Sequence, residues 1–188
     1  MADGTNIKDF MIHTKWYVGF PMPDDWMQKH IAAVKEHYNN CIKCKDWLGA
    51  IFIVERPYRA QELCNLLPYM SSKEKWEAIK EVYIDSENPS INYDFWKLCF
   101  TLDDLKDFYD ESKKDLSDTL KIYRGMSIKE YKSKKRGFSW TLSKEKAEFF
   151  AHRFKRNGVV EELDVNKNDV VCFLPDRKEQ EVIYFVGG

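Results

Sequence analysis

The sequence lacks any long hydrophobic run. No apolar stretch approaches the roughly 20 residues that a membrane-spanning helix needs, and the most apolar one, WLGAIFIVE at Trp47 to Glu55, has the length of a strand. The first residues, MADGTNIKDF, contain no basic region followed by an apolar stretch, so we expect no secretory signal. We therefore expect a cytoplasmic protein without a membrane partner.

The sequence also lacks an excess of charge of either sign. Its 30 basic and 31 acidic residues give a net charge of −1, which provides no bulk attraction to nucleic acid or to anionic lipid. The basic run KSKKRG, Lys132 to Gly137, is most simply a solvated loop, so a nucleic acid is an alternative partner that we do not favour. A hydrophobic content of 44% is enough for a sizeable core and excludes a disordered chain.

The cysteines do not form the pairs of a disulfide framework or of a zinc site. There are five, an odd number, and without a secretory signal we expect reduced thiols. Cys41 and Cys44 form a lone CxxC, whereas a structural zinc site needs four ligands, usually as two pairs. The four histidines show no metal or triad spacing. We therefore predict packing thiols and no metal.

The sequence contains no internal repeat and no low-complexity linker, which predicts a single domain over residues 1–188. Its character changes near residue 117, from a mostly helical part (1–117) to a β-rich part (118–188). Helical spacing of apolar residues predicts helices over residues 23–38, 71–85 and 101–111. Ser71 and Glu74 have the spacing of a capping box at the start of the second helix. We expect Trp26 in the core.

The second part predicts five strands, because runs of β-branched and aromatic residues alternate with Gly, Asn, Asp or Pro. The strands are Thr119–Gly125, Gly137–Leu142, Gly158–Val165, Asp169–Pro175 and Glu181–Val186. One helix, Ser143 to Phe154, interrupts them. This order has too few helices for a doubly wound sheet. The sequence predicts an α+β fold, in which the helical N-terminal half packs with a mainly antiparallel, β-rich core.

Polar residues occupy core-like positions on three of these strands. Arg124 ends the first strand, Ser139 and Thr141 lie in the second, and Glu179 and Glu181 open the last. Residues two apart on a strand share a face, so each pair would point into one cleft if the last strand begins at Glu179. A network of ion pairs that closes one end of the sheet is the structural alternative. Because buried charge is costly, three such strand ends favour a site.

The chemistry of these groups suits a phosphorylated sugar compound. A guanidinium binds an anion bidentately, a carboxylate beside a sugar carbon stabilises an oxocarbenium-like transition state, and hydroxyls can hold that carboxylate in place. Together they predict cleavage of a glycosidic bond.

The motifs KIYRG, FSWTLS and KEQEV, in this order and each on a predicted strand, resemble the arginine-serine-glutamate class of ADP-ribosyltransferases. The matching stretch runs from Thr119 to Phe185. The resemblance implies NAD as the substrate and an arginine of a protein target as the acceptor. ERPYRA and YIDSENPS, in the first half, are similar to uncharacterised phage and prophage proteins with such a domain. The resemblance thus implies a toxin-like phage protein that acts in the host cytoplasm.

The resemblance also implies roles for residues on the strands. Arg124 would bind an NAD phosphate or the nicotinamide ribose, and the backbone of Gly125 would lie near the nicotinamide amide. Ser139 would donate a hydrogen bond to the catalytic glutamate or the ribose, and Thr141 would support the strand. Glu181 would bind the ribose and stabilise the cation that forms as nicotinamide leaves.

The resemblance implies further roles as well. Glu179 matches the upstream acid that orients an acceptor arginine in this family. Phe149 or Phe150 would stack on nicotinamide, and Arg153 and Arg156 lie where the family often places a phosphate contact.

The sequence departs from the family pattern in two places. Trp140 replaces the middle residue of the usual Ser-Thr-Ser triplet, on the face opposite Ser139, where packing is the simplest role. The loop LPDRK, which precedes Glu179, is short, and in the family this loop recognises the target. Two alternatives therefore stay open. One is an NAD glycohydrolase with water as the acceptor, and the other is a non-catalytic phage inhibitor or interaction protein that uses this fold.

Overall fold

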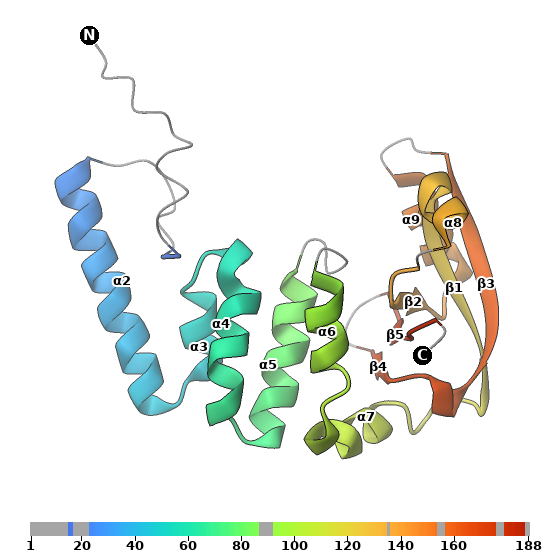
Figure 1. Ribbon diagram of the computed structural model, residues 1–188, viewed down its shortest axis with the longest axis horizontal. Helices are drawn as coiled ribbons and strands as arrows, with labels where there is room; N and C mark the ends of the chain where they lie inside the picture. The colour runs from blue at the N-terminus through green and yellow to red at the C-terminus, as the bar shows by residue number, and fades with distance from the viewer. Residues whose placement is uncertain are drawn as a thin grey trace, which may run out of the picture. The chain divides into compact units, whose positions relative to one another are not determined.

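The chain divides into two compact units, Met1–Ser86 and Glu87–Gly188, in a computed structural model that describes residues 15–16, 23–86, 92–134, 136–153, 157–175 and 179–186 (Figure 1). The described residues form helices and a five-stranded antiparallel sheet, which confirms the α+β class. None of the helices in these ranges is both long and apolar enough to cross a membrane. The single-domain organisation of the chain stays a prediction.

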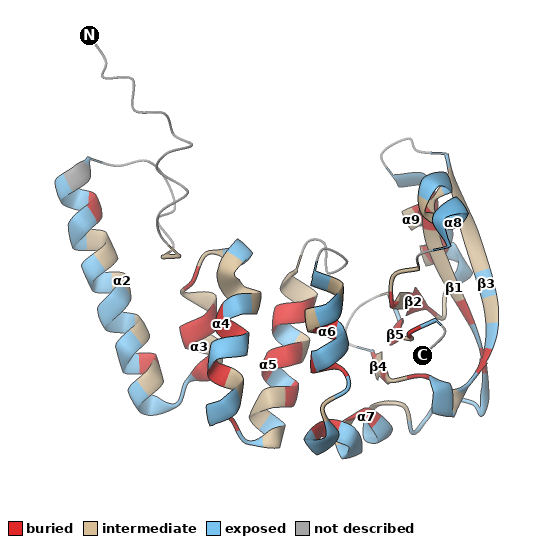
Figure 2. Cartoon of the chain, in the orientation of Figure 1, coloured by how far each residue is buried: buried red, intermediate tan, exposed pale blue. Residues whose placement is uncertain are grey.

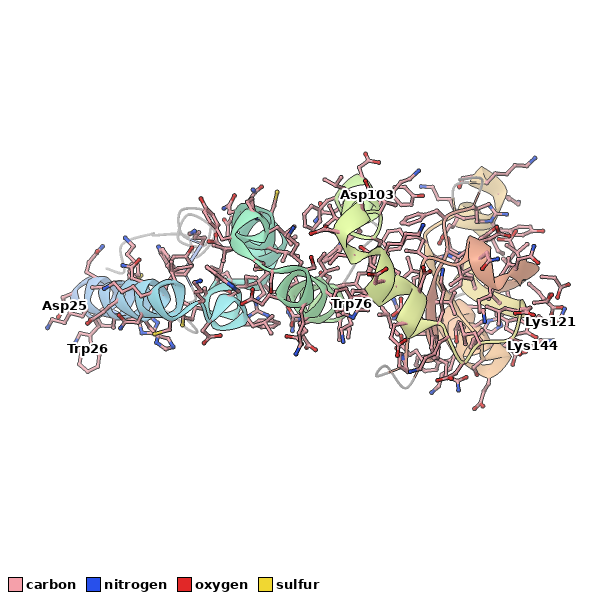
Figure 3. All side chains as sticks on the ribbon, turned by 90° about the horizontal axis from the view of Figure 1, so that it is seen from below. Asp25, Trp26, Trp76, Asp103, Lys121 and Lys144 are labelled. Carbon is pink, nitrogen blue, oxygen red and sulfur yellow. The ribbon has the colours of Figure 1, made fainter. Side chains whose placement is uncertain are left out.

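The first unit is helical, as the sequence predicts. Its described elements are α2 (Asp24–Cys44), α3 (Trp47–Phe52), η1 (Arg56–Tyr58), α4 (Arg59–Leu66), η2 (Leu67–Tyr69) and α5 (Ser72–Asp85). The buried residues of α3, α4 and α5 form the core of this unit (Figure 2). Trp26 lies outside that core: it is 67% exposed and projects from α2 (Figure 3). The expectation of a buried Trp26 is wrong because its neighbour Met27, at 5% exposure, takes the inward position on the helix.

The most apolar stretch of the sequence forms a helix. Although Trp47 to Glu55 has the length of a strand, residues Trp47–Phe52 form α3. Asp46 begins this helix, because its carboxylate accepts a hydrogen bond of 2.9 Å from the backbone N–H of Gly49. The indole of Trp47 then donates to Glu74 of α5 over 3.1 Å. An N-cap and a tertiary contact outweigh the strand-like composition.

Arg59 joins the stretch ERPYRA to the end of α5 in the first unit. Its Nε donates to the carbonyl of Val54 over 3.0 Å, and one Nη donates to that of Phe52 over 3.2 Å. Its other Nη forms an ion pair of 2.6 Å with Asp85, at the end of α5. Arg59 therefore satisfies carbonyls at the end of α3 and ties ERPYRA to the start of YIDSENPS, whose residues 87–90 lie outside the described ranges.

The predicted capping box begins α5. The Ser71 side chain accepts from the backbone N–H of Glu74, and the Glu74 carboxylate accepts from the backbone N–H of Ser71 over 2.8 Å. We expect Ser71→Ala to lower the free energy of unfolding by about 1 kcal/mol. Ser71→Thr keeps a hydroxyl that accepts from the N–H of Glu74 and donates to its carboxylate, a contact of 2.6 Å in the unmodified protein, and should leave that free energy nearly unchanged. Chemical denaturation of the three proteins measures this difference. Equal losses in both variants would show that the cap contributes little.

The second unit contains the sheet and the helices that flank it. The sheet has the order β3-β1-β2-β5-β4, and every predicted strand forms in the predicted place, three of them shorter. The elements are α6 (Tyr93–Cys99), η4 (Asp103–Leu105), α7 (Lys106–Ser112), β1 (Thr119–Ser127), α8 (Ile128–Ser133), β2 (Ser139–Thr141), α9 (Lys144–His152), β3 (Gly158–Asn166), η6 (Lys167–Asp169), β4 (Cys172–Leu174) and β5 (Glu181–Ile183). Two helices, α8 and α9, interrupt the strands where one was expected.

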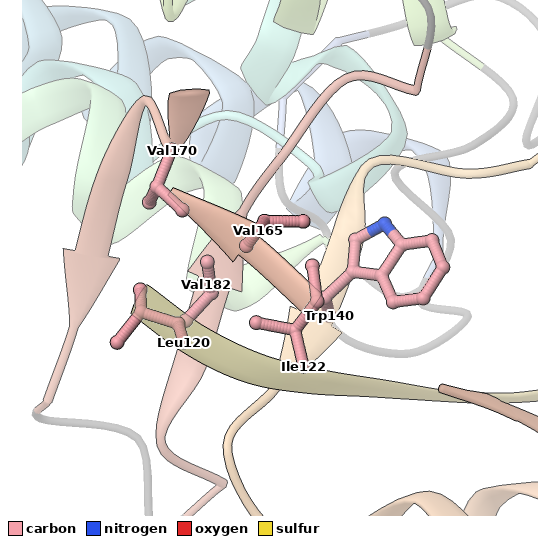
Figure 4. Close-up of a cluster of buried hydrophobic side chains, with 6 residues drawn as sticks. All are labelled: Leu120, Ile122, Trp140, Val165, Val170 and Val182. Carbon is pink, nitrogen blue, oxygen red and sulfur yellow. The ribbon is translucent and has the colours of Figure 1, made fainter. Parts of the chain in front are cut away.

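One face of the sheet carries a hydrophobic core. Its buried members lie together in Figure 4: Leu120, Ile122, Trp140, Val165, Val170 and Val182. The two edges of the sheet are β3 and β4, and the chain crosses between them through η6 and two further residues, among them Val170 of this core. The predicted packing role of Trp140 is confirmed, since its side chain is 2% exposed.

Two helices flank the sheet in different ways. At the edge strand β4, the N–H of Phe173 donates to the Ser112 hydroxyl of α7 over 3.1 Å, and Lys113 donates to the carbonyl of Val170 over 2.8 Å. On the face opposite the hydrophobic core, α9 packs on β1 and β3 through Gly125 and Gly158. Although α6 and α7 are helices of the predicted helical part, they belong to the compact unit that contains the sheet.

Candidate functional site

A row of paired residues crosses the sheet and fixes which side chains share a face. The register pairs Glu162 with Tyr123, Tyr123 with Thr141, Thr141 with Glu181, and Glu181 with Leu174. Side chains directly opposite on neighbouring strands point to the same face. Thr141 and Glu181 therefore lie on one face, and Ser139, two residues from Thr141, lies there as well.

Ser139 and Glu181 are in direct contact on this face. The Ser139 hydroxyl donates a hydrogen bond to Oε1 of Glu181, across the antiparallel pair β2 and β5. Glu181 is only 1% exposed, and Thr141 is 5% exposed. A carboxylate buried to this degree requires such partners, and the hydrogen bond fixes the orientation of its two oxygens. The sequence pointed to both residues, and the structure brings them together.

Glu179 does not share the strand of Glu181. The regular strand β5 begins at Glu181, and Gln180 has a left-handed backbone with φ of 49°. The two acids would share one face only if the strand began at Glu179, and this condition is not met. Thr141 fixes the turn instead, because its hydroxyl donates to the carbonyl of Glu179 over 2.5 Å and accepts from the N–H of Ser143 over 3.0 Å.

The side chain of Arg124 leaves β1 on the face of the sheet opposite to the one that carries Thr141 and Glu181. Arg124 follows Tyr123 in β1, so its side chain leaves the strand on the side of Ile122 and Trp140. Its guanidinium nevertheless reaches β2, where Nη1 donates to the carbonyl of Ser139 over 2.5 Å. Arg124 thus contacts the main chain of Ser139, whose side chain binds Glu181.

A residue that the sequence interpretation did not single out binds Arg124. The Nε and Nη2 atoms of Arg124 both donate to Oε1 of Glu130, over 3.1 and 2.8 Å. Glu130 lies in the first turn of α8, whose N-cap Ser127 accepts from the N–H of Glu130 over 3.1 Å. The spacing Ser-x-x-Glu was the signal for this turn, as it was for α5.

A second ion pair lies on the same side of β1 and β3. Arg136, from the run KSKKRG, binds the carboxylate of Glu161 through Nε and Nη2, the latter over 2.8 Å. Glu161 is the residue of β3 directly opposite Arg124. The prediction of a solvated loop for this run is therefore wrong in part, since α8 extends to Ser133 and Arg136 is anchored to the sheet.

The aromatic residues of α9 lie at its exposed side. Phe149 is 62% exposed and Phe150 is half-buried, and their rings are 5.5 Å apart in an edge-on arrangement. The guanidinium of Arg153 lies 5.1 Å from the centre of the Phe150 ring, within reach of a cation–π interaction. Arg156, the other proposed phosphate contact, lies outside the described residues.

Gly125 has a packing role that the sequence did not reveal. A Cβ at this position would lie 1.9 Å from the carbonyl oxygen of Ala147 and 2.6 Å from the N atom of Ala151. Only glycine therefore allows the backbone of α9 to approach β1 so closely. This contact places α9 on the face of the sheet that carries Ser139 and Glu181.

The CxxC pair does not present two equivalent thiols. Cys41 is buried and Cys44 is exposed, both near the end of α2. Burial and the nearby Asp46 carboxylate raise the pKa of the Cys41 thiol, which disfavours the thiolate that a metal requires. In the part of the chain that the structure describes, no three His, Cys, Asp or Glu residues gather as a metal site would need.

Comparison of the chain with protein-family models, with curated proteins and with solved structures finds no match.

Proposed function

We propose that the chain is an NAD-dependent mono-ADP-ribosyltransferase that modifies an arginine of a protein target and releases nicotinamide. The observation that carries this proposal is the hydrogen bond from Ser139 to Glu181, the serine and glutamate of the three sequence motifs, across two paired strands. Arg124, the residue of the remaining motif, supports the proposal by its contact with the carbonyl of Ser139.

In this reaction the bond between the nicotinamide nitrogen and the ribose C1′ breaks, and its electron pair leaves with nicotinamide. The ribose is left with oxocarbenium character, which the negative charge of Glu181 would stabilise. Ser139 would hold the Glu181 carboxylate in a single orientation as this charge develops. A guanidine nitrogen of the acceptor arginine then bonds to C1′ and loses a proton, for which Glu179 is the proposed base.

The burial of the site favours a second candidate, a non-catalytic interaction protein. Glu181 is 1% exposed, and three N–H groups of Arg124 are already bound to Glu130 and Ser139. In this candidate the polar residues stabilise the end of the sheet, and NAD neither binds nor reacts. The two candidates therefore differ in whether the folded protein binds NAD.

The Glu179→Gln variant tests the choice of arginine as the acceptor. Thr141 holds the turn through the main-chain carbonyl of Glu179, so glutamine should leave the geometry unchanged while removing the base. We expect transfer of label from adenylate-labelled NAD to lysate proteins to fall about a hundredfold, while release of nicotinamide to water persists. The purified variant and the unmodified protein are compared in one assay, after circular dichroism has established their folding.

Other results of this assay would indicate other functions for the protein. Nicotinamide release that never labels a protein would indicate an NAD glycohydrolase. Protein labelling that Glu179→Gln leaves intact would indicate another acceptor. A folded protein that neither binds nor cleaves NAD would favour the interaction protein.

A further inference from the structure

We propose that Glu130 is a built-in competitor for the anion that Arg124 would bind, so that a pyrophosphate has to displace the Glu130 carboxylate from the guanidinium. This inference rests on the proposed function, because NAD supplies the pyrophosphate. It assigns a role in ligand affinity to α8, the short helix between β1 and β2.

The hydrogen bonds of Arg124 carry this inference. A guanidinium binds an oxyanion bidentately along one of its edges. The edge formed by Nε and Nη2 is taken by Oε1 of Glu130, over 3.1 and 2.8 Å. The other edge is formed by Nη1 and Nη2, and its Nη1 donates to the carbonyl of Ser139 over 2.5 Å. An incoming phosphate therefore meets no edge with both of its groups free, and the contact it can replace without disrupting the sheet is Glu130.

The exposure of the two partners fits a displaceable carboxylate. The side chain of Arg124 is 14% exposed and that of Glu130 is 30% exposed, so Glu130 is the more accessible partner. At this depth solvent ions screen the pair only in part. While Glu130 is in place, its charge neutralises Arg124 and repels a phosphate.

The sheet holds Arg124 in place without Glu130. The carbonyl of Ser139 anchors Nη1, and Gly137 lies against the guanidinium so closely that a Cβ there would be 2.4 Å from Nη2. Removing the charge of Glu130 should therefore leave the guanidinium near its present position, available to an anion.

Isothermal titration of the full chain with inorganic pyrophosphate tests the inference. We expect Glu130→Gln to bind pyrophosphate roughly three- to tenfold more tightly than the unmodified protein, the range that corresponds to one such ion pair. Glu148→Gln is the matched control. It removes the same charge from an exposed position of α9, which packs on the opposite face of β1, and it should leave the affinity unchanged. Adding Arg124→Ala to Glu130→Gln should abolish the gain.

The readouts separate a failure of this inference from a failure of the proposed function. Equal, weaker or unmeasurable binding by folded Glu130→Gln would overturn the role of Glu130, as would an equal gain in Glu148→Gln. The same proteins are then assayed for nicotinamide release from NAD. Release of nicotinamide without a change in the affinity of Glu130→Gln for pyrophosphate would support the proposed function and overturn the role of Glu130. A gain in pyrophosphate affinity without release in any variant supports the anion site and contradicts the enzyme.

Discussion

Replacing Glu181 by glutamine is expected to lower the rate of nicotinamide release from NAD by about a hundredfold or more, with the fold retained. Glutamine has the shape of glutamate and keeps an oxygen that accepts the hydrogen bond of Ser139. It lacks the negative charge that would stabilise the oxocarbenium-like transition state. The rate of release from labelled NAD, compared at saturating substrate, measures the effect.

Glu162→Gln is the control for this variant. Glu162 lies in the same row of paired residues, on the same face of the sheet, and its exposed carboxylate forms an ion pair of 2.6 Å with Lys121. The same substitution there should leave the rate unchanged. If Glu181→Gln retained the rate of the unmodified protein, Glu181 would be a structural carboxylate that only supports Ser139.

Gly125→Ala should be among the most destabilising single changes in the sheet unit, at about 2–3 kcal/mol of unfolding free energy. The new methyl group would lie 1.9 Å from the Ala147 carbonyl oxygen and 2.6 Å from the Ala151 nitrogen. These are backbone atoms of α9, so the whole helix has to move away from β1. We expect a lower midpoint in urea unfolding, followed by circular dichroism.

Gly137→Ala makes a close contact of another kind and serves as the control. Its methyl group would lie 2.4 Å from Nη2 of Arg124, so the guanidinium has to move but no backbone of a neighbouring helix does. We expect a smaller loss than for Gly125→Ala, about 1 kcal/mol, because one side chain and its hydrogen bonds adjust. Equal stability of Gly125→Ala and the unmodified protein would contradict the packing of α9 on β1.

The strands were predictable because two signals coincide in each of them: residues that favour strands along the run, and turn residues at its ends. Each of the five runs is rich in β-branched or aromatic residues and has Gly, Asn, Asp or Pro at one or both of its ends, and each forms in place. Ser71 and Glu74 likewise mark the start of α5. The strand-like composition of Trp47 to Glu55 did not predict a helix, because composition does not show that Asp46 caps a helix there or that Trp47 binds Glu74.

The candidate site was predictable only in part, because a sequence gives alternation along a strand but not where the strand begins. Ser139 and Glu181 meet as their motifs suggest. Glu179 lies outside the strand because Gln180 adopts a left-handed backbone. Nothing in the sequence KEQEV predicts this conformation. The register of β1 with β2 places Arg124 on the other face, and a strand pairing of this kind cannot be read from one motif. The capping spacing before Glu130 was readable, but its ion pair with Arg124 was not.

Proton NMR of NAD mixed with the purified, unmodified protein tests the proposed function most directly. The spectrum reports binding through broadening of the NAD signals and cleavage through the appearance of free nicotinamide. The proposed transferase predicts both, with nicotinamide accumulating as the NAD signals decline. Sharp, unchanged NAD signals in the presence of folded protein would contradict it and leave the Ser139 and Glu181 pair as part of the sheet's structure.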